Sequence, residues 1–234
     1  MENSSSELAD QVITIFYFRI SKNMDETSIQ NLISTLSLNV QSKLASFQNK
    51  MTRNQSLFGH IMLNYIKTGF GFPDSELSYE HTSGKPYFTT TPKIGFNVSH
   101  SGHLVVCCFT KNADLGIDLE QKGKHSIKNF RYCFNSEEWQ YIMNSENPEK
   151  AFLHLWVRKE AIIKADGRGM EIELSSFSGL ESEVNIGLNT WCLQDITIDP
   201  DYFCAIACSK KKEVKLVDFN SILNLKNNFY DISR

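Results

Sequence analysis

The segment Leu-Gly-Ile-Asp-Leu-Glu at residues 115–120 alternates between apolar side chains and side chains that are small or acidic. Successive side chains of a β-strand point to opposite faces, so Asp118 and Glu120 lie on one face of the predicted strand, one pleat apart. Two carboxylates this close repel each other unless a cation lies between them, and magnesium binds carboxylates together with phosphates. The segment therefore predicts either a half-buried strand with a solvated acidic face or one part of a magnesium site.

A predicted helix at residues 148–166 supplies a further carboxylate. The helix has proline at its first position and glycine directly after its last, which are the residues favoured there. Trp156, Glu160 and Lys164 are spaced by four and form one stripe. Glu160 and Lys164 form either a surface pair worth roughly a few tenths of a kcal/mol or part of the site. In the second case Glu160 completes a set of three carboxylates, and Lys164 meets the same phosphates.

Two segments before the acidic strand contain candidates for phosphate binding. A strand is predicted at residues 94–98, followed by a loop at 99–102 with His100 among small residues. Residues 84–86, Gly-Lys-Pro, are predicted to form a stiffened turn that presents Lys85. Each segment also has a plain interpretation, since a loop histidine is often an ordinary surface residue and Gly-Lys-Pro an ordinary turn.

Composition limits the function classes. The chain has 234 residues, 41% of them hydrophobic, and a formal net charge of −3. A negative charge argues against broad nucleic-acid binding and against a nuclease built on the same carboxylates. No apolar run reaches the ~20 residues of a membrane span, and the acidic, polar start does not resemble a secretory signal. We therefore expect a cytoplasmic protein whose six cysteines are reduced.

Helices and strands alternate along the rest of the chain, which predicts an α+β (α/β layered) fold. The loosely repeated order suggests two similar subdomains, 1–113 and 114–234, with the metal site in the second. Further strands are predicted at residues 12–19, 76–81, 104–110, 191–196, 202–208 and 214–219. Further helices are predicted within 27–49, at 54–67, at 130–134 and from a cap at Asn135 or Ser136.

Four motifs, in this order and at these separations, resemble those of the 4'-phosphopantetheinyl transferases of the surfactin-synthetase-activating (Sfp) type. They are Gly-Lys-Pro at 84–86, Phe-Asn-Val-Ser-His-Ser-Gly at 96–102, Gly-Ile-Asp-Leu-Glu at 116–120 and Trp-Val-Arg-Lys-Glu-Ala-Ile-Ile-Lys at 156–164. Phe134 with Glu138 is similar to a fifth, weaker motif. The lone acidic motif is unspecific, whereas the ordered set is specific.

The resemblance implies two subdomains related by a pseudo-twofold axis, with coenzyme A bound between them. It implies transfer of phosphopantetheine from coenzyme A to a serine of an apo acyl or peptidyl carrier protein, with release of adenosine 3',5'-bisphosphate. The implied site residues are Asp118, Glu120 and Glu160 as magnesium ligands, Lys164 and His100 at phosphates, and Gly84, Lys85, Pro86 and Ser99 along the coenzyme A cleft.

Two assignments stay open within this resemblance. A base must take the serine proton; Glu160 is the first candidate, and Glu120 and Glu138 are rivals. The family often has a helical arginine that contacts the 3'-phosphate, and Gln55 stands at that position here. Arg53 is the candidate to take over this contact, with His60 as an alternative.

An alternative function is a non-catalytic module that binds coenzyme A or another nucleotide and keeps the same fold. The full set of three carboxylates and Lys164 favours the enzyme. The resemblance also implies a monomer, because single-chain members of the family are pseudo-dimers. Nothing in the sequence selects one carrier protein or pathway.

Overall fold

The computed structural model describes residues 11–69, 77–79, 86–88, 94–123 and 126–223. The first half of the chain contains β1 (Val12–Arg19), α2 (Glu26–Ser34), α3 (Leu38–Ala45), α4 (Lys50–Gly69), β2 (Leu77–Tyr79), β3 (Pro86–Phe88), β4 (Ile94–Ser101) and β5 (Leu104–Lys111). The second half contains β6 (Leu115–Gln121), η1 (Ile127–Cys133), α5 (Ser136–Asn144), α6 (Pro148–Asp166), η2 (Gly169–Glu171), η3 (Leu174–Ser176), β7 (Glu183–Ile186), β8 (Asn189–Asp195), β9 (Tyr202–Cys208) and β10 (Glu213–Asp218).

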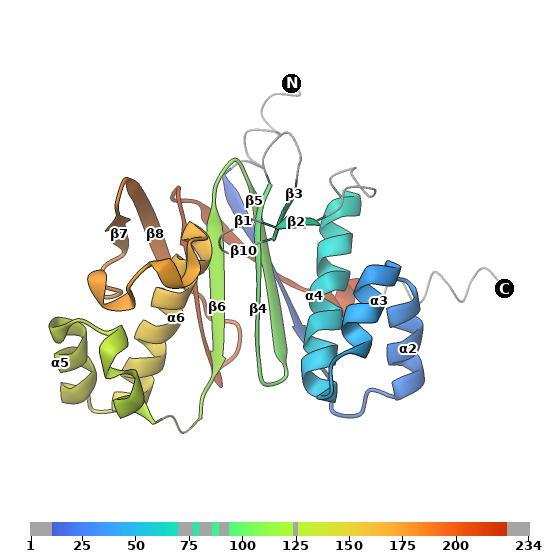
Figure 1. Ribbon diagram of the computed structural model, residues 1–234, viewed down its shortest axis with the longest axis horizontal. Coiled ribbons are helices and arrows are strands. Elements are labelled where there is room, and N and C mark those ends of the chain that lie inside the picture. The colour runs from blue at the N-terminus through green and yellow to red at the C-terminus, as the bar shows by residue number, and fades with distance from the viewer. Residues whose placement is uncertain (1–10, 70–76, 80–85, 89–93, 124–125, 224–234) are drawn as a thin grey trace.

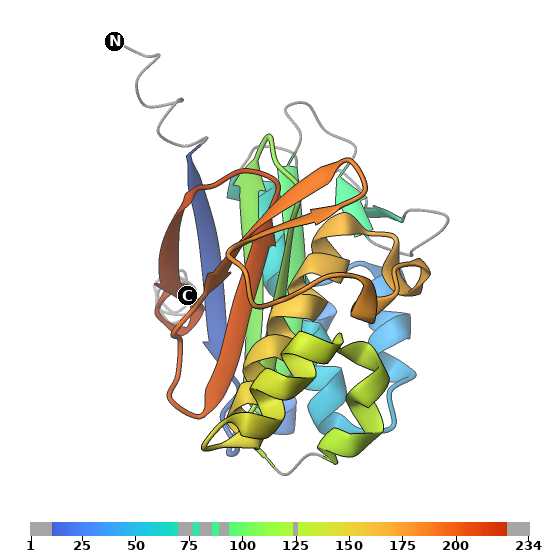
Figure 2. The same cartoon turned by 90° about the vertical axis from the view of Figure 1, so that its left-hand side faces the viewer.

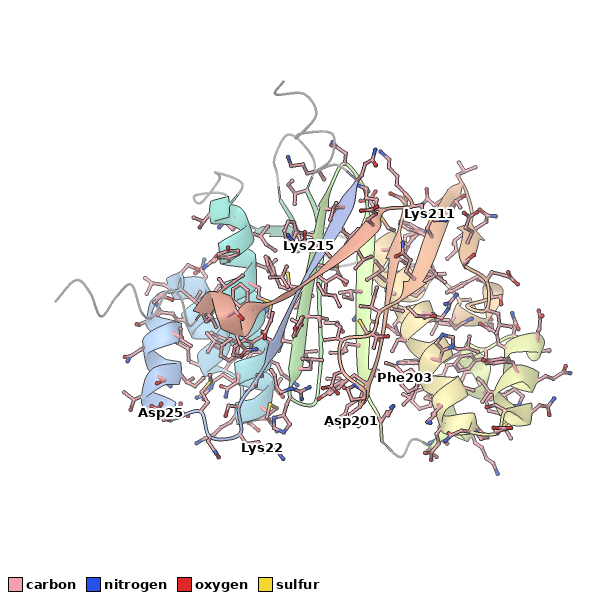
Figure 3. The ribbon with its side chains drawn as sticks, turned by 180° about the vertical axis from the view of Figure 1, so that it is seen from behind. Lys22, Asp25, Asp201, Phe203, Lys211 and Lys215 are labelled. Atoms are coloured by element: carbon pink, nitrogen blue, oxygen red, sulfur yellow. The ribbon has the colours of Figure 1, made fainter. Side chains whose placement is uncertain are left out.

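The described strands form two four-stranded sheets and a short β2–β3 pair. The first sheet has the order β10-β1-β5-β4 and the second β6-β9-β8-β7. Strand β10 runs parallel to β1, as the view from behind in Figure 3 shows, whereas the other pairs are antiparallel. Because β10 comes from the second half of the chain, the last strand of the predicted subdomain 114–234 completes the first sheet.

The apolar residues gather in layers between these elements. Phe16, Phe18 and Phe96 pack with α4 on one face of the first sheet. The opposite face packs on the second sheet through residues such as Ile15 and Ile117. Helix α6 covers the remaining face of the second sheet (Figures 1 and 2). The mixed α+β architecture is therefore confirmed.

Most predicted elements are present, with two corrections. The loop predicted at residues 99–102 is wrong, because β4 continues to Ser101 and pairs there with Leu104 of β5. The helix predicted from residue 54 begins at Lys50, where the side chain of Asn49 accepts hydrogen bonds from the first turn. The first correction matters for the site, since a strand holds its side chains in register and a loop does not.

Two further observations bear on the sequence interpretation. The six cysteines are free. Within the described ranges, no helix has the length and apolar character needed to cross a membrane.

Candidate active site

Strands β4 and β6 belong to different sheets, yet they lie side by side at the centre of the molecule (Figure 1). Side chains at alternating positions of β4 bridge to β6 along this line, which we call the seam. Three of these bonds join Asn97 Oδ1 to Ile117 N (3.0 Å), Ser99 Oγ to Asp118 Oδ1 (3.0 Å) and Ser101 Oγ to Glu120 Oε2 (2.8 Å). The period of two along β4 therefore places its polar side chains on the strand that carries the acidic pair.

Helix α6 lies directly on β6 because Gly116 has no side chain. A Cβ at this position would be 2.3 Å from Ala161 O and 2.4 Å from Ala165 N, which is closer than real contacts allow. The helix begins with Pro148 and ends before Gly167, which has a left-handed conformation, as the sequence predicts.

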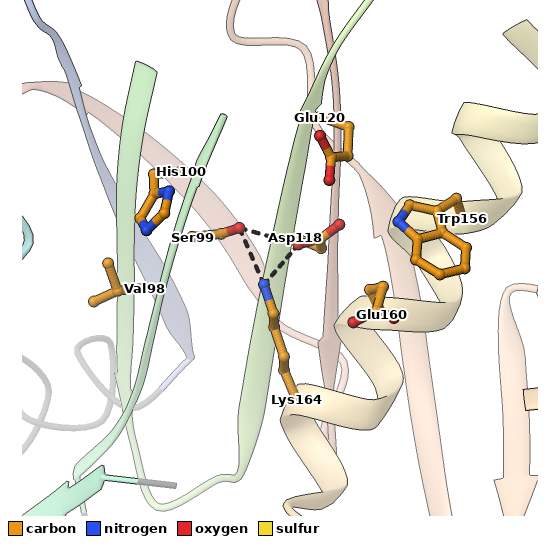
Figure 4. Close-up of a pocket in the computed structure, with 8 residues that line it drawn as sticks. All are labelled: Val98, Ser99, His100, Asp118, Glu120, Trp156, Glu160 and Lys164. Atoms are coloured by element: carbon orange, nitrogen blue, oxygen red, sulfur yellow. Dashed lines mark hydrogen bonds and ion pairs between the residues drawn. The ribbon is translucent and has the colours of Figure 1, made fainter. Parts of the chain in front are cut away.

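The seam and α6 enclose a pocket of about 320 Å³. Its lining residues, drawn in Figure 4, are Val98, Ser99, His100, Asp118, Glu120, Trp156, Glu160 and Lys164. The structure thus brings together the predicted stripe of α6, the predicted acidic pair and two residues of the serine–histidine motif. Val98 is the one lining residue to which the sequence analysis gave no role.

Lys164 and Asp118 form the polar centre of the pocket. Lys164 Nζ lies 2.6 Å from Asp118 Oδ1 and 3.0 Å from Ser99 Oγ (Figure 4). The other carboxylate oxygen, Asp118 Oδ2, is buried and has no hydrogen-bond partner among the described residues. A buried acceptor without a partner costs free energy, so this oxygen is suited to bind a cation.

Burial and nearby charges shift the pKa values of Glu160 and His100, which also line the pocket. Burial raises the pKa of Glu160, and the carboxylate of Asp118 raises it further. Burial lowers the pKa of His100, and the charge of Lys164 adds to this effect. The pocket thus favours a neutral imidazole beside the lysine, and it disfavours three bare negative charges side by side.

The carboxylates of the pocket are candidate ligands for magnesium. Among the described residues, no three His, Cys, Asp or Glu side chains are already arranged to hold a metal ion. The donor set nevertheless fits, because three carboxylates line one pocket and Asp118 Oδ2 lacks a partner. Asp118, Glu120 and Glu160 remain the predicted ligands.

Arg53 and Gln55, the two residues of α4 discussed for the contact with the 3'-phosphate, do not line the pocket. Arg53 is bound by both carboxylate oxygens of Glu26, at 2.7 and 3.0 Å. Gln55, at the position of the family's arginine, is buried and donates to Gly102 O at 2.9 Å. Neither residue presents a cation to the pocket in this structure.

Glu138, one of the three candidate bases, is fully buried outside the pocket. Its carboxylate accepts from Lys159 Nζ, at 2.6 and 2.7 Å, and from Gly179 N at 2.7 Å. It also forms a capping box with Asn135 at the start of α5. A carboxylate bound in this way has no path to a substrate proton, which leaves Glu160 and Glu120.

The predicted Gly-Lys-Pro turn lies only partly within the described residues. Gly84 and Lys85 lie outside the described residues. Pro86 is the first residue of β3. Their predicted contacts with coenzyme A remain predictions.

Known proteins with similar sequences are 4'-phosphopantetheinyl transferases. Residues 114–207 match the sequence profile of the 4'-phosphopantetheinyl transferase superfamily. The 4'-phosphopantetheinyl transferase Sfp of Bacillus subtilis (strain 168) is 25% identical, over 89% of this chain and 99% of its own length. The 4'-phosphopantetheinyl transferase psf-1 of Bacillus pumilus is 29% identical, over 86% of this chain and 91% of its own.

A more distant organism contributes a third relative. The 4'-phosphopantetheinyl transferase HetI of Nostoc sp. is 27% identical, over 86% of this chain and 88% of its own length. The matched profile covers the acidic strand and all of α6, so it includes every carboxylate of the pocket. Over most of its length the chain is similar to 4'-phosphopantetheinyl transferases, among them members of the Sfp type.

Proposed function

We propose that this protein transfers 4'-phosphopantetheine from coenzyme A to a serine hydroxyl of an apo acyl or peptidyl carrier protein. The bond between the adenosine-side phosphate oxygen and the phosphopantetheinyl phosphorus breaks, and the serine oxygen forms the new bond. The other product is adenosine 3',5'-bisphosphate. We further propose that the reaction depends on magnesium and that the enzyme acts as a cytoplasmic monomer.

The observation that carries the proposal is the pocket between the seam and α6. It combines three carboxylates with a lysine, and one buried carboxylate oxygen lacks a partner. Phosphoryl transfer needs mainly positioning and neutralisation of charge, so such a site suits a pyrophosphate substrate. Asp118, Glu120 and Glu160 would hold Mg²⁺, whose charge offsets that of the pyrophosphate as the bond breaks.

The chain's own cation is Lys164. Its side chain is 29% exposed and lines the pocket, so its ammonium group can bind a phosphate oxygen there. His100 and Ser99 line the opposite wall on β4. His100 can donate a hydrogen bond to a further phosphate oxygen, whereas the hydroxyl proton of Ser99 is directed to Asp118. Together these groups would orient the phosphorus toward the incoming serine.

The serine must lose a proton as it attacks. Glu160 is the first candidate to take it, directly or through a water molecule, and Glu120 is the second. Both line the pocket, and burial makes Glu160 a stronger base than an exposed glutamate.

The test is to incubate the protein with coenzyme A, Mg²⁺ and a panel of apo carrier proteins, and to weigh the carriers by mass spectrometry. We expect at least one carrier to gain a single phosphopantetheinyl group. Glu160→Gln should abolish the gain, whereas Glu149→Gln, an exposed glutamate on the same helix, should leave it unchanged.

The competing function is a module that binds coenzyme A without transfer. It would be supported if calorimetry showed magnesium-linked coenzyme A binding while every carrier of the panel kept its mass. Retained transfer by Glu160→Gln would instead refute the role of Glu160. Gel filtration at twice the mass of the chain would refute the monomer.

A further inference from the structure

The last bond of the seam involves Ser101, the final residue of β4. Its hydroxyl donates to Glu120 Oε2 at 2.8 Å and accepts from the backbone Gln121 N at 3.0 Å. Ser101 thus contacts two successive residues of the acidic strand, although it belongs to the other sheet. The proposed function gives Ser101 no role, because it does not line the pocket.

The hydrogen bond to Glu120 has a fixed direction. A serine hydroxyl has one proton to donate, and an N–H group can only donate. Because the Gln121 N–H points at the oxygen of Ser101, the hydroxyl proton is directed to the carboxylate of Glu120. A hydrogen bond to a charged acceptor is roughly twice as strong as a neutral one, so it holds this carboxylate oxygen in one orientation.

The backbone next to Ser101 is itself fixed from both halves of the molecule. Gly102 turns the chain with a φ of 53°, and its carbonyl accepts from Gln55 Nε2 of α4 at 2.9 Å. His103 N donates to the hydroxyl of Tyr202 in β9 at 3.1 Å. Ser101 therefore has a rigid support, which a residue that orients another side chain requires.

Glu120 needs such support more than its neighbour does. Asp118 is buried and is held by Ser99 and Lys164, whereas Glu120 is longer and only partly buried near the end of β6. Without Ser101 the Glu120 side chain would sample more rotamers at the edge of the pocket. Binding a cation would then cost the conformational entropy of ordering that side chain.

We propose that Ser101 is a positioning residue, which holds the carboxylate of Glu120 in the orientation that binds the divalent cation. This inference rests on the proposed function, because it takes Glu120 as a metal ligand. It predicts a loss of metal affinity rather than a loss of folding. Partners that orient metal ligands commonly contribute roughly 10- to 100-fold to affinity or activity.

The experiment measures Mn²⁺ binding to the full-length protein by electron paramagnetic resonance, with the metal alone. Ser101→Ala should bind Mn²⁺ about 10-fold more weakly than the wild type. Ser101→Thr, which keeps the hydroxyl on an extended strand, should bind like the wild type. Ser101→Val has nearly the shape of threonine without the hydroxyl, so it should bind as weakly as alanine, with a thermal midpoint close to that of Ser101→Thr.

The matched control is Ser175→Ala. Ser175 also donates to a glutamate, Glu173 Oε1 at 2.7 Å, but outside the pocket, so its loss should leave Mn²⁺ binding unchanged. Equal Mn²⁺ affinity in wild type, Ser101→Ala and Ser101→Val would overturn the inference and leave the proposed function standing. Absence of Mn²⁺ binding by the wild type would overturn this inference together with the proposed metal ligands, whereas the mass of the carriers decides on transfer itself.

Discussion

Helix α6 carries two lysines that each bind a carboxylate from another element, and the two pairs differ in what they leave unsatisfied. Lys159 and Glu138 are both fully buried. Lys159 Nζ donates to both carboxylate oxygens and to Phe177 O, which uses all three of its hydrogens. Lys164 is partly exposed in the pocket, and its partner Asp118 keeps one buried oxygen without a hydrogen bond.

The difference separates a pair whose hydrogen bonds are complete from a pair that is suited to a ligand. In the Lys159 pair every strong acceptor has a donor, so a ligand could bind only by breaking bonds that already exist. In the Lys164 pair the missing bond is one that a ligand can supply. Burial alone would have pointed to the wrong pair, because the more deeply buried charges are those outside the pocket.

Lys159→Met is expected to have the largest effect, and the effect is on stability. The substitution leaves the carboxylate of Glu138 buried without its cation, which costs about 3–5 kcal/mol in the free energy of unfolding. Urea denaturation measures this loss, and Lys150→Met on the exposed surface of the same helix is the control. A variant as stable as the wild type would show that the pair does not hold α5 to α6.

Asp118→Asn is expected to act on transfer instead. The amide keeps the shape and an acceptor for Lys164 but removes one charge of the proposed metal site, so kcat should fall about 100- to 1,000-fold. The free energy of unfolding should stay within about 1 kcal/mol, because the weakened pair with Lys164 is offset by relief of repulsion from Glu160.

The control for this variant is Asp199→Asn. Asp199 pairs with Arg19 outside the pocket, so its loss should leave kcat unchanged. If Asp118→Asn unfolded the protein while Asp199→Asn did not, Asp118 would have a structural role like that of Glu138, and the contrast between the two pairs would fail.

Lys164→Met makes the comparison direct, because it repeats the Lys159 substitution on the same helix. We expect transfer to fall about 100-fold through the loss of a cation at the phosphates. The unfolding free energy should fall by less than in Lys159→Met, since Lys164 is partly exposed and Asp118 keeps its hydrogen bond from Ser99. Kinetics and urea denaturation of the two methionine variants, measured side by side, should therefore give opposite patterns.

Local signals predicted α6 and β1 well. Proline at the start and glycine after the end marked the bounds of α6, and the β-branched and aromatic run at residues 12–19 coincides with β1. The loop predicted around His100 failed because small polar residues resemble a loop locally, whereas their strand is fixed by pairing with β5. Pairing with a distant strand cannot be seen in a short window of sequence.

The site was predictable only in part. Spacing placed Asp118 with Glu120, and Glu160 with Lys164. It left a joint site of the two pairs as one of two alternatives, which the resemblance to a family then favoured. The bond between Lys159 and Glu138 and the bridge from Ser101 to Glu120 were missed, because each joins elements whose relative placement depends on the whole fold. The alternation of Asn97, Ser99 and Ser101 was the signal available for the second of these.

Gly116→Ala tests whether the pair of Lys164 with Asp118 depends on the close packing of α6 against β6. An added Cβ would meet Ala161 O and Ala165 N, so the helix must move away at a cost of about 1–3 kcal/mol. The matched control is Gly69→Ala, where a Cβ meets nothing within 4 Å, so no loss of stability is expected. Because Glu160 and Lys164 move with α6 whereas Asp118 stays on β6, transfer should fall even in the folded fraction. Full activity per folded molecule would show that the pocket tolerates this movement, and that the Lys164 pair does not depend on the close packing of α6 on β6.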